Sequence, residues 1–339
     1  MAAYIKHISY YTPRCVLTNE ELIKDFPEWT VKRVASKVGI DQRYISDEDE
    51  TAGDMAAKAA EKLFEQHDVS PKIVDFIILC TQSPDYYLPT TACILQHRLG
   101  VPTQSGAFDF NLGCSGYIYG LAMAKSFIHS GIAKNILLLT SETYTKHIHA
   151  KDKGNRTIFS DAASATLVST SGFAKIGEFN LGTDGSGAEN LIVKTGCMRQ
   201  QKQLEDYTTL KDGSFTSSDH LYMNGAEIFS FTQKMVPTLV DAILSINKFN
   251  KSAIDLFVFH QANKFMLDFL QRKAKIDKQK FFHCLSRFGN TVSSTIPIAL
   301  AEAIQQDRIN YGHKILLAGF GVGYSWGGTI LEINETLGL

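Results

Sequence analysis

The chain has 339 residues, 44% of them hydrophobic and 20% charged, and its 34 Lys and Arg nearly balance 35 Asp and Glu to give a net charge of −1. This composition is typical of a globular protein with a large core and argues against the strongly basic surface of a nucleic-acid-binding protein. No run approaches the ~18 apolar residues of a membrane span, and the first residues lack the apolar stretch of a signal peptide, so we expect a cytoplasmic protein with no membrane contact.

In the first part of the chain, one cysteine lies between a predicted strand and a predicted helix. Residues 107–110 read as a short strand, and residues 117–129 carry apolar side chains at helical spacing. Cys114 lies between them in Asn-Leu-Gly-Cys-Ser-Gly. Unpaired N–H groups and the helix dipole favour a thiolate there, so we expect the pKa of this thiol to fall below the free value of ~8.5. The sequence thus predicts a nucleophile, and the alternative is a buried cysteine that acts as a small apolar residue.

Two polar residues in the second part follow apolar segments in the same way. Residues 255–259 read as a strand that ends at His260, and a second helical pattern begins shortly afterwards. Asn290 follows Gly289 in a polar loop that leads into a helix near Pro297. Both are candidate active-site residues. The alternatives are that His260 only caps its helix and that Asn290 is an ordinary turn residue.

The last motif is the glycine-rich run 318–328, which follows the predicted strand 315–317. A dinucleotide-binding motif would open a strand–helix–strand unit, and the chain ends before such a unit could form. Dense glycines favour a loop whose backbone amide acts as an oxyanion donor, with the Cys114 amide as the second donor. A tight hairpin is the alternative.

The six cysteines are scattered without a Cys-x-x-Cys pair, which argues against a disulfide framework or a structural zinc site. His147 and His149 form a pair without an accompanying carboxylate or cysteine motif. We therefore predict no metal.

Similar patterns recur in the two parts of the chain. Residues 73–79 parallel 253–259 at an offset of 180, and residues 121–138 parallel 300–317 at an offset of 179. The repeat predicts two like halves, 1–172 and 173–339, each with a sheet covered on both faces. Cys114, His260 and Asn290 would then meet between the halves.

Four motifs taken together resemble the β-ketoacyl-acyl carrier protein synthase III family: Gly-Cys-Ser-Gly at 113–116, His-Gln-Ala-Asn at 260–263, Gly-Asn-Thr at 289–291 and the glycine-rich run at 320–327. The resemblance implies an α/β, thiolase-like five-layer α-β-α-β-α fold made of two duplicated halves, working as a homodimer. It also implies acyl transfer from acyl-CoA to a cysteine and decarboxylative condensation with malonyl-acyl carrier protein, which initiates fatty acid biosynthesis. Acyl-CoA is a substrate in this scheme, and no cofactor is expected.

The resemblance also implies roles for individual residues. Cys114 would be the nucleophile, while His260 and Asn290 would stabilise the enolate. The amides of Cys114 and Val322 would form the oxyanion hole, and Phe320 would shield the departing carboxylate. Gly321 and Gly323 lie on either side of Val322 in the glycine-rich loop.

Substrate contacts follow from the same resemblance. Trp29 and Arg156 would stack the adenine of coenzyme A, and Arg33 would contact a phosphate, although the extra residues 34–37 leave Lys37 as an alternative. Asn263 would contact substrate. Leu88 stands where relatives often have Phe in the wall that a partner subunit contributes, which predicts a primer larger than acetyl.

Two residues depart from the family pattern at positions that would contact the acyl carrier protein. Phe265 and Ser230 stand where the family has basic residues, so a replacement basic patch would have to bind an acidic carrier protein. The candidates for this patch are Lys264, Arg272, Lys273 and Lys275.

Because these two positions depart from the family pattern, an alternative function is a synthase-III-like acyltransferase of specialised metabolism that uses a non-carrier or non-malonyl acceptor. A papain-like hydrolase shares the Cys, His, Asn order but not the surrounding motifs, and a non-catalytic partner subunit would usually lack the cysteine.

Overall fold

The computed structural model describes residues 1–209 and 215–335. Its strands are β1 Tyr4–Tyr11, β2 Cys15–Thr18, β3 Gln42–Ile45, β4 Phe76–Cys80, β5 Gly106–Phe110, β6 Asn135–Glu142, β7 Ala162–Ser169, β8 Ala174–Ile176, β9 Asn180–Thr183, β10 Leu191–Ile192, β11 Thr208–Thr209, β12 Phe215–Thr216, β13 Tyr222–Met223, β14 Leu256–Phe259, β15 Phe281–Phe282, β16 Lys314–Gly321 and β17 Ser325–Ile333. Its α-helices are α1 Asn19–Asp25, α2 Val31–Val38, α3 Ala52–Gln66, α4 Thr91–Arg98, α5 Gly116–Ser130, α6 Lys153–Arg156, α7 Gly225–Ile246, α8 Lys264–Lys273, α9 Leu285–Phe288 and α10 Thr295–Gln305. Six short 3-10 helices complete the described elements: η1 Pro71–Ile73, η2 Tyr144–His147, η3 Gly185–Asn190, η4 Lys251–Ala253, η5 Lys278–Lys280 and η6 Val292–Ser294.

The strand order repeats itself. In the first half β5, β4 and β6 are parallel neighbours, β7 continues the sheet antiparallel to β6, and β1 pairs antiparallel with β7. In the second half β15, β14 and β16 are parallel neighbours, and β17 continues antiparallel to β16. The short strand β8 pairs with both β17 and β1, which joins the two sets into one hydrogen-bonded sheet of 11 strands.

The repeat extends to individual hydrogen bonds. Asp75 precedes β4, and its Oδ2 accepts a hydrogen bond from the backbone N–H of Asn135 at 2.9 Å. Asp255 precedes β14, and its Oδ2 accepts from the backbone N–H of Lys314 at 2.8 Å. The weak sequence repeat therefore marks equivalent places in two copies of one strand-and-helix unit.

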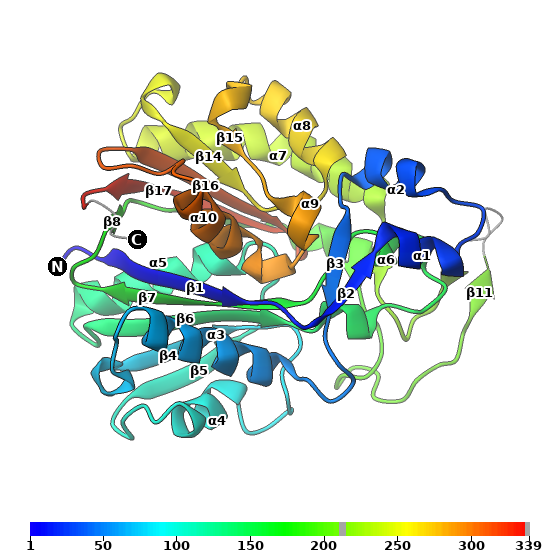
Figure 1. Cartoon of the computed structure of the whole chain (residues 1–339), viewed down its shortest axis with the longest axis horizontal. Coiled ribbons are helices and arrows are strands. Elements are labelled where there is room, and N and C mark those ends of the chain that lie inside the picture. Colours follow the sequence, from blue (N-terminus) through cyan, green and yellow to red (C-terminus); the bar gives the residue numbers. More distant parts are fainter. Residues whose placement is uncertain (210–214, 336–339) are drawn as a thin grey trace.

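Three core clusters define five layers, which can be followed in Figure 1. Helices α3 and α4 pack on the outer face of the first-half strands, and α7 and α8 pack on the outer face of the second-half strands. Helices α5 and α10 share a cluster with strands of both halves and thus form the middle layer. In β4, Ile77 and Leu79 face the outer cluster while Ile78 faces the middle one, because successive side chains point to opposite faces of a sheet. The structure confirms the predicted α-β-α-β-α arrangement.

The close approach of α5 to β4 fixes the position of the start of α5, just after Cys114. A Cβ on Gly116, the first residue of α5, would overlap Cys80 Sγ in β4, so glycine permits this close contact. The helix ends at Gly131, whose φ of 76° suits a left-handed cap. In the described residues, no helix combines the length and the apolar character needed to cross a bilayer.

Candidate active site

Cys114 lies after β5 and just before α5, and only 6% of its surface is exposed. The backbone N–H groups of Val322 and of Cys114 itself lie beside the thiol and favour its anion. A Cβ on Gly321 would lie 2.8 Å from the sulfur, so the chain of β16 runs directly against the cysteine. The two amides predicted to form an oxyanion hole therefore both lie next to the sulfur.

The expected lowering of the Cys114 pKa is wrong for the unliganded site. Burial raises the pKa of this thiol to about 12, and the negative charge of Glu142 contributes to the increase. The amide hydrogen bonds from Val322 and Cys114 act in the opposite direction without outweighing burial. The helix start was visible in the sequence, but burial was not.

His260 follows β14 and is 2% exposed. The Thr295 hydroxyl donates to the carbonyl oxygen of Val292 at 2.9 Å, and its Oγ1 lies 2.7 Å from His260 Nδ1. The hydroxyl has a single proton: when the proton goes to Val292, Nδ1–H donates to Oγ1. When the proton goes to Nδ1 instead, the ring proton sits on Nε2, the tautomer that can donate to a ligand. Burial lowers the pKa of His260 to about 3, so the ring is neutral near pH 7.

Asn290 is 4% exposed and precedes η6. Its backbone N–H donates to Ile158 O at 2.9 Å, and its carbonyl accepts from Ser160 N–H at 3.0 Å. The N–H of Val292 donates to Asn290 Oδ1 at 2.9 Å. Because this bond uses the side-chain oxygen, the orientation of the amide is fixed and its NH₂ group is left to act as a donor.

The glycine-rich run forms the hairpin of β16 and β17, and its turn lies next to Cys114. The tight-hairpin alternative is thus correct as structure, and the same turn presents the Val322 amide. The rings of Phe320 and His260 meet edge to face with centroids 5.8 Å apart. Cys114 and Phe320 belong to one core cluster, which also contains Val292 of the loop after Asn290.

The predicted coenzyme A residues lie around two aromatic rings. The Arg33 guanidinium and the Lys37 ammonium lie 5.6 and 5.3 Å from the centroid of the Trp29 ring. Arg156 instead lies 5.3 Å from the Phe26 ring and forms an ion pair with Asp25 at 2.9 Å. Since the Phe26 and Trp29 centroids are 6.3 Å apart, these cations gather in one region, but Arg156 does not lie on the Trp29 ring in this structure.

The last two predicted residues differ in their surroundings. Asn263 Oδ1 accepts from the N–H of Met266 at 2.9 Å and so caps α8. Leu88 is 82% exposed, beside the exposed Tyr86 and Tyr87. It does not line the pocket next to Cys114 within this chain.

That pocket has a volume of about 690 Å³ and is lined by Gln82, Asn111, Tyr144 and Val322 among others. Gln82, Asn111 and Tyr144 were not predicted from the sequence. Glu142 and Thr295 were not predicted either. Glu142 had a visible signal, since it is an acidic residue at the end of an apolar strand, whereas the other residues have no distinctive pattern.

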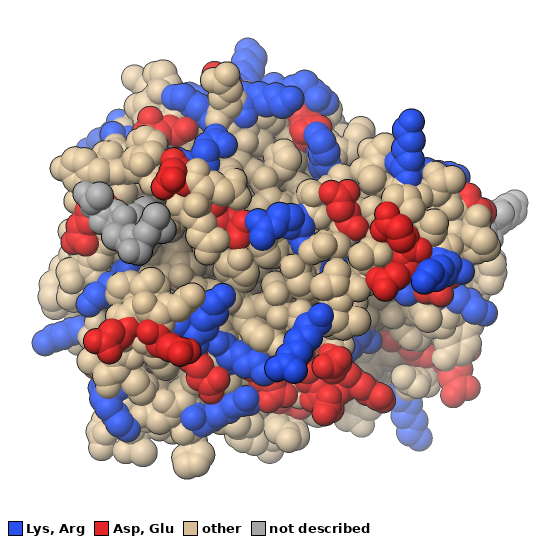
Figure 2. All heavy atoms as spheres, viewed as in Figure 1, with Lys and Arg blue, Asp and Glu red and all other residues tan. Residues whose placement is uncertain are grey.

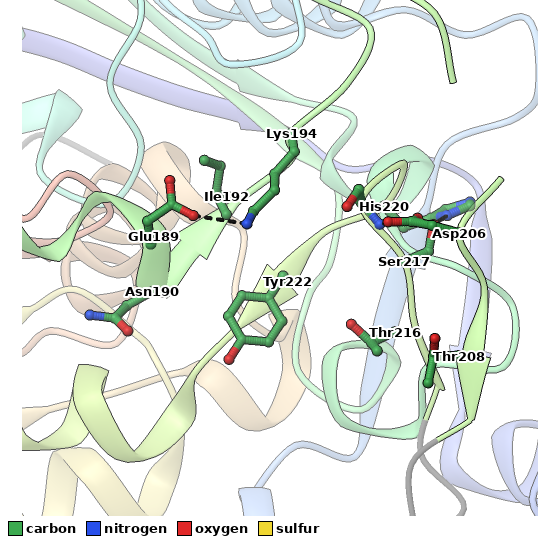
Figure 3. Close-up of a pocket in the computed structure, with 11 residues that line it drawn as sticks. Glu189, Asn190, Ile192, Lys194, Asp206, Thr208, Thr216, Ser217, His220 and Tyr222 are labelled. Carbon is green, nitrogen blue, oxygen red and sulfur yellow. Dashed lines mark hydrogen bonds and ion pairs between the residues drawn. The ribbon is translucent and has the colours of Figure 1, made fainter. Parts of the chain in front are cut away.

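A second pocket, shown in Figure 3, has a volume of about 460 Å³ and shares the lining residue Ile192 with the first. Its wall carries an ion pair between Glu189 and Lys194 at 2.8 Å. It contains none of the predicted site residues. In the part of the chain that the structure describes, no group of three or more His, Cys, Asp or Glu is arranged to hold a metal ion.

Comparisons with known proteins agree on one family. The 3-oxoacyl-[acyl-carrier-protein (ACP)] synthase III model matches residues 108–185, and the model of that family's C-terminal part matches residues 244–333. The chain is 36% identical to a β-ketoacyl-[acyl-carrier-protein] synthase III of Clostridium perfringens, over 95% of this chain and 97% of that protein. Identity to the protein of the same name from Caldanaerobacter subterraneus is 32%, over 99% of both.

Solved structures give the same result. A 3-oxoacyl-(acyl-carrier-protein) synthase III matches with a TM-score of 0.96 and 47% identity, over 98% of this chain and 100% of that one. A 3-oxoacyl-(acyl-carrier protein) synthase of Burkholderia xenovorans matches with a TM-score of 0.91 and 34% identity, over 98% of this chain and 95% of that one. Fold and site together define a thiolase-like acyltransferase. The chain belongs to the β-ketoacyl-[acyl-carrier-protein] synthase III family.

Proposed function

We propose that this enzyme loads an acyl group from acyl-CoA onto Cys114 and condenses it with malonyl-acyl carrier protein, using no cofactor. The observation that carries the proposal is the convergence on one buried thiol of two backbone amides, with a neutral imidazole and an oriented carboxamide in the adjoining loops. Each of these groups suits a different step of the reaction.

In the first step, the Cys114 sulfur attacks the thioester carbonyl of acyl-CoA. The oxygen becomes negatively charged, and the N–H groups of Cys114 and Val322 stabilise it because they already point into the site. Coenzyme A then leaves as its thiol with the proton that Cys114 lost. The buried position of the sulfur limits hydrolysis of the acyl-enzyme.

In the second step, the malonyl thioester loses carbon dioxide and its thioester oxygen becomes an enolate. His260 Nε2 and the Asn290 amide donate hydrogen bonds to that oxygen. A histidine whose pKa is about 3 is neutral, so it donates a hydrogen bond without supplying an imidazolium proton to the carbanion. The carbanion then attacks the acyl thioester, and the Cys114 thiolate leaves and regains a proton.

The decisive experiment separates the two steps. The protein is incubated with a panel of acyl-CoAs, the mass of the acyl-enzyme is measured, and malonyl-acyl carrier protein or malonyl-CoA is added. We expect loading at Cys114 followed by a β-ketoacyl product. Loading without condensation would favour an acyltransferase with a different acceptor, and an intact thiol with every donor would contradict the proposal.

A second copy of the chain is the proposed partner at Tyr86, Tyr87 and Leu88, which are exposed large apolar residues at the margin of the Cys114 pocket. We propose that Leu88 of one copy enters the acyl pocket of the other. Leu88→Phe should then shift the preference of Cys114 loading toward shorter acyl-CoAs, measured by single-turnover acylation, while Leu88→Asp should weaken the dimer in sedimentation. A chain that sediments as a monomer at working concentration would contradict this.

An acidic carrier protein is the proposed partner of α8. Figure 2 shows Lys and Arg side chains gathered over the α8 region of Figure 1. Phe265 in this helix is 61% exposed and packs on Phe229, with ring centroids 5.4 Å apart. Replacing Arg272 and Lys273 with Glu should raise KM for malonyl-acyl carrier protein and leave KM for malonyl-CoA unchanged.

A further inference from the structure

Glu142 is a carboxylic acid buried beside the active site. It is the last residue of β6 and is fully buried. Its oxygens accept hydrogen bonds from Gln82 N–H at 3.0 Å, from Ser83 Oγ at 3.3 Å and from Ser293 Oγ at 2.9 Å. None of the ion pairs in the described residues includes it. A buried carboxylate without a cation favours its neutral form.

The hydrogen-bond partners of Glu142 connect it to the reacting groups on both halves. The side-chain oxygen of Gln82 lies against Gly113, where an added Cβ would be 2.6 Å away, so the Gln82 segment borders Cys114. Ser293 belongs to η6, between Asn290 and Thr295. Glu142 therefore links the cysteine side of the site to the loop that presents the proposed enolate donors.

Burial also shifts the pKa values of the other titratable groups near Glu142. The pKa values of the Cys80 thiol and the Tyr144 hydroxyl are raised well above their usual ranges by burial and by Glu142. Burial raises the pKa of Asp161, and the negative charge of Asp161 in turn raises the pKa of Glu142. By contrast, burial lowers the pKa values of the bases His260 and His147. Burial raises the pKa of Glu142 itself to about 8, so this group titrates where enzymes work.

We propose that Glu142 is a positioning residue that decides whether Cys114 can ionise: the thiolate forms while the Glu142 carboxyl holds a proton and is suppressed once that carboxyl is charged. Two neighbouring buried anions repel each other, so loss of the first proton opposes loss of the second. No bond is made or broken in this step, and each proton is exchanged with solvent. The inference rests on the proposed role of Cys114 as nucleophile, but its consequence can be measured on the thiol alone.

The experiment is alkylation by iodoacetamide from pH 6.5 to 9.5, with modification of the Cys114 peptide followed by mass spectrometry. An ordinary high-pKa thiol reacts ~10-fold faster for each pH unit, because the thiolate is the nucleophile. In the wild type we expect the slope to flatten near pH 8, where Glu142 becomes charged. Glu142→Gln keeps the shape of the side chain without its charge, so the alkylation rate of this variant should keep rising ~10-fold for each pH unit. For a coupling of one pKa unit, the variant should match the wild type at pH 7 and react ~5-fold faster at pH 9.

Ser293→Ala is the second variant, and it protects the test if Glu142→Gln fails to fold. It keeps the carboxyl group but removes a hydrogen bond that favours the charged form, so the bend in the wild-type profile should move to higher pH. The peptide that contains Cys284, a buried thiol whose pKa is raised by burial and by Glu302 rather than by Glu142, serves as the internal control for general unfolding. Equal, unbroken slopes in wild type and Glu142→Gln, or an unmoved profile in Ser293→Ala, would overturn the inference. Because no acyl donor is present, this result is independent of whether the proposed condensation occurs.

Discussion

Cys114 is surrounded by groups that disfavour its anion in the unliganded site and stabilise an oxyanion beside it. Burial raises the pKa of the thiol to about 12, while the amides of Cys114 and Val322 favour a negative charge at this place. The sulfur therefore ionises only in small amounts until substrate binds. This arrangement protects the Cys114 thiol from oxidation, since reactivity follows thiolate character.

The three proposed catalytic side chains should separate into two groups on replacement. Cys114→Ala should not be acylated by any acyl-CoA. His260→Ala and Asn290→Ala should be acylated but should decarboxylate malonyl thioester ~10²–10³-fold more slowly, because each removes one donor to the enolate oxygen. Acyl-enzyme mass and release of carbon dioxide measure the two steps. An Asn290→Ala variant that condenses at the wild-type rate would refute its role.

Gly321 tests how closely the hairpin must approach the cysteine. An added Cβ would lie 2.7 Å from Cys114 Cβ and 2.8 Å from its sulfur, which is closer than real Cβ contacts allow. Gly321→Ala should slow acylation at least ~10-fold by displacing the sulfur, with ~1–3 kcal/mol lost from the unfolding free energy. Gly185→Ala is the matched control because nothing lies within 4 Å of its Cβ position. Equal acylation rates in the two variants would show that the contact is unimportant.

At the scale of elements, the site is assembled from strand ends and helix starts of both repeats. Cys114 precedes α5 and Asn290 precedes α10 by way of η6, so equivalent places in the two copies supply the nucleophile and one enolate donor. The second copy adds His260 at the end of β14. The η6 segment is held to β6 by Ser293 on Glu142 and by Ser294 on Thr140 at 2.8 Å.

Thr295, the first residue of α10, tests whether this helix start controls His260. In Thr295→Val the ring Nδ1–H would turn to the carbonyl of Val292, which leaves Nε2 without a proton and unable to donate. We expect decarboxylation to fall ~10-fold or more with acylation unchanged. Thr295→Ser keeps the hydroxyl and should restore most of the rate. If the valine variant decarboxylates malonyl thioester normally, the hydroxyl does not orient the ring.

For the whole molecule, the buried Glu142 predicts how stability depends on pH. Its pKa is about 8 in the folded protein against 4.5 for the free group, so the folded form holds the proton more tightly. This stabilising contribution is complete below pH 4.5 and is lost as the pH rises through 8. Relative to Glu142→Gln, the wild type should lose on the order of 3–5 kcal/mol of unfolding free energy between pH 4.5 and 9. Urea titrations at several pH values measure this difference, and parallel pH profiles would contradict it.

From the sequence one can predict the strands and helices that flank the motifs, the repeat and the motif residues, because these depend on local periodicity and on residue types next to strand and helix ends. It located strands near 76–80 and 256–259 and helices after Cys114 and near Pro297, all of which are present. Tertiary structure decided the rest. Burial sets the pKa values of Cys114, Glu142 and His260, and burial depends on layers that pack together from distant segments. The partners Thr295 and Ser293 were likewise invisible in the sequence, since a hydroxyl becomes functional only when folding places it within hydrogen-bonding distance of a particular atom.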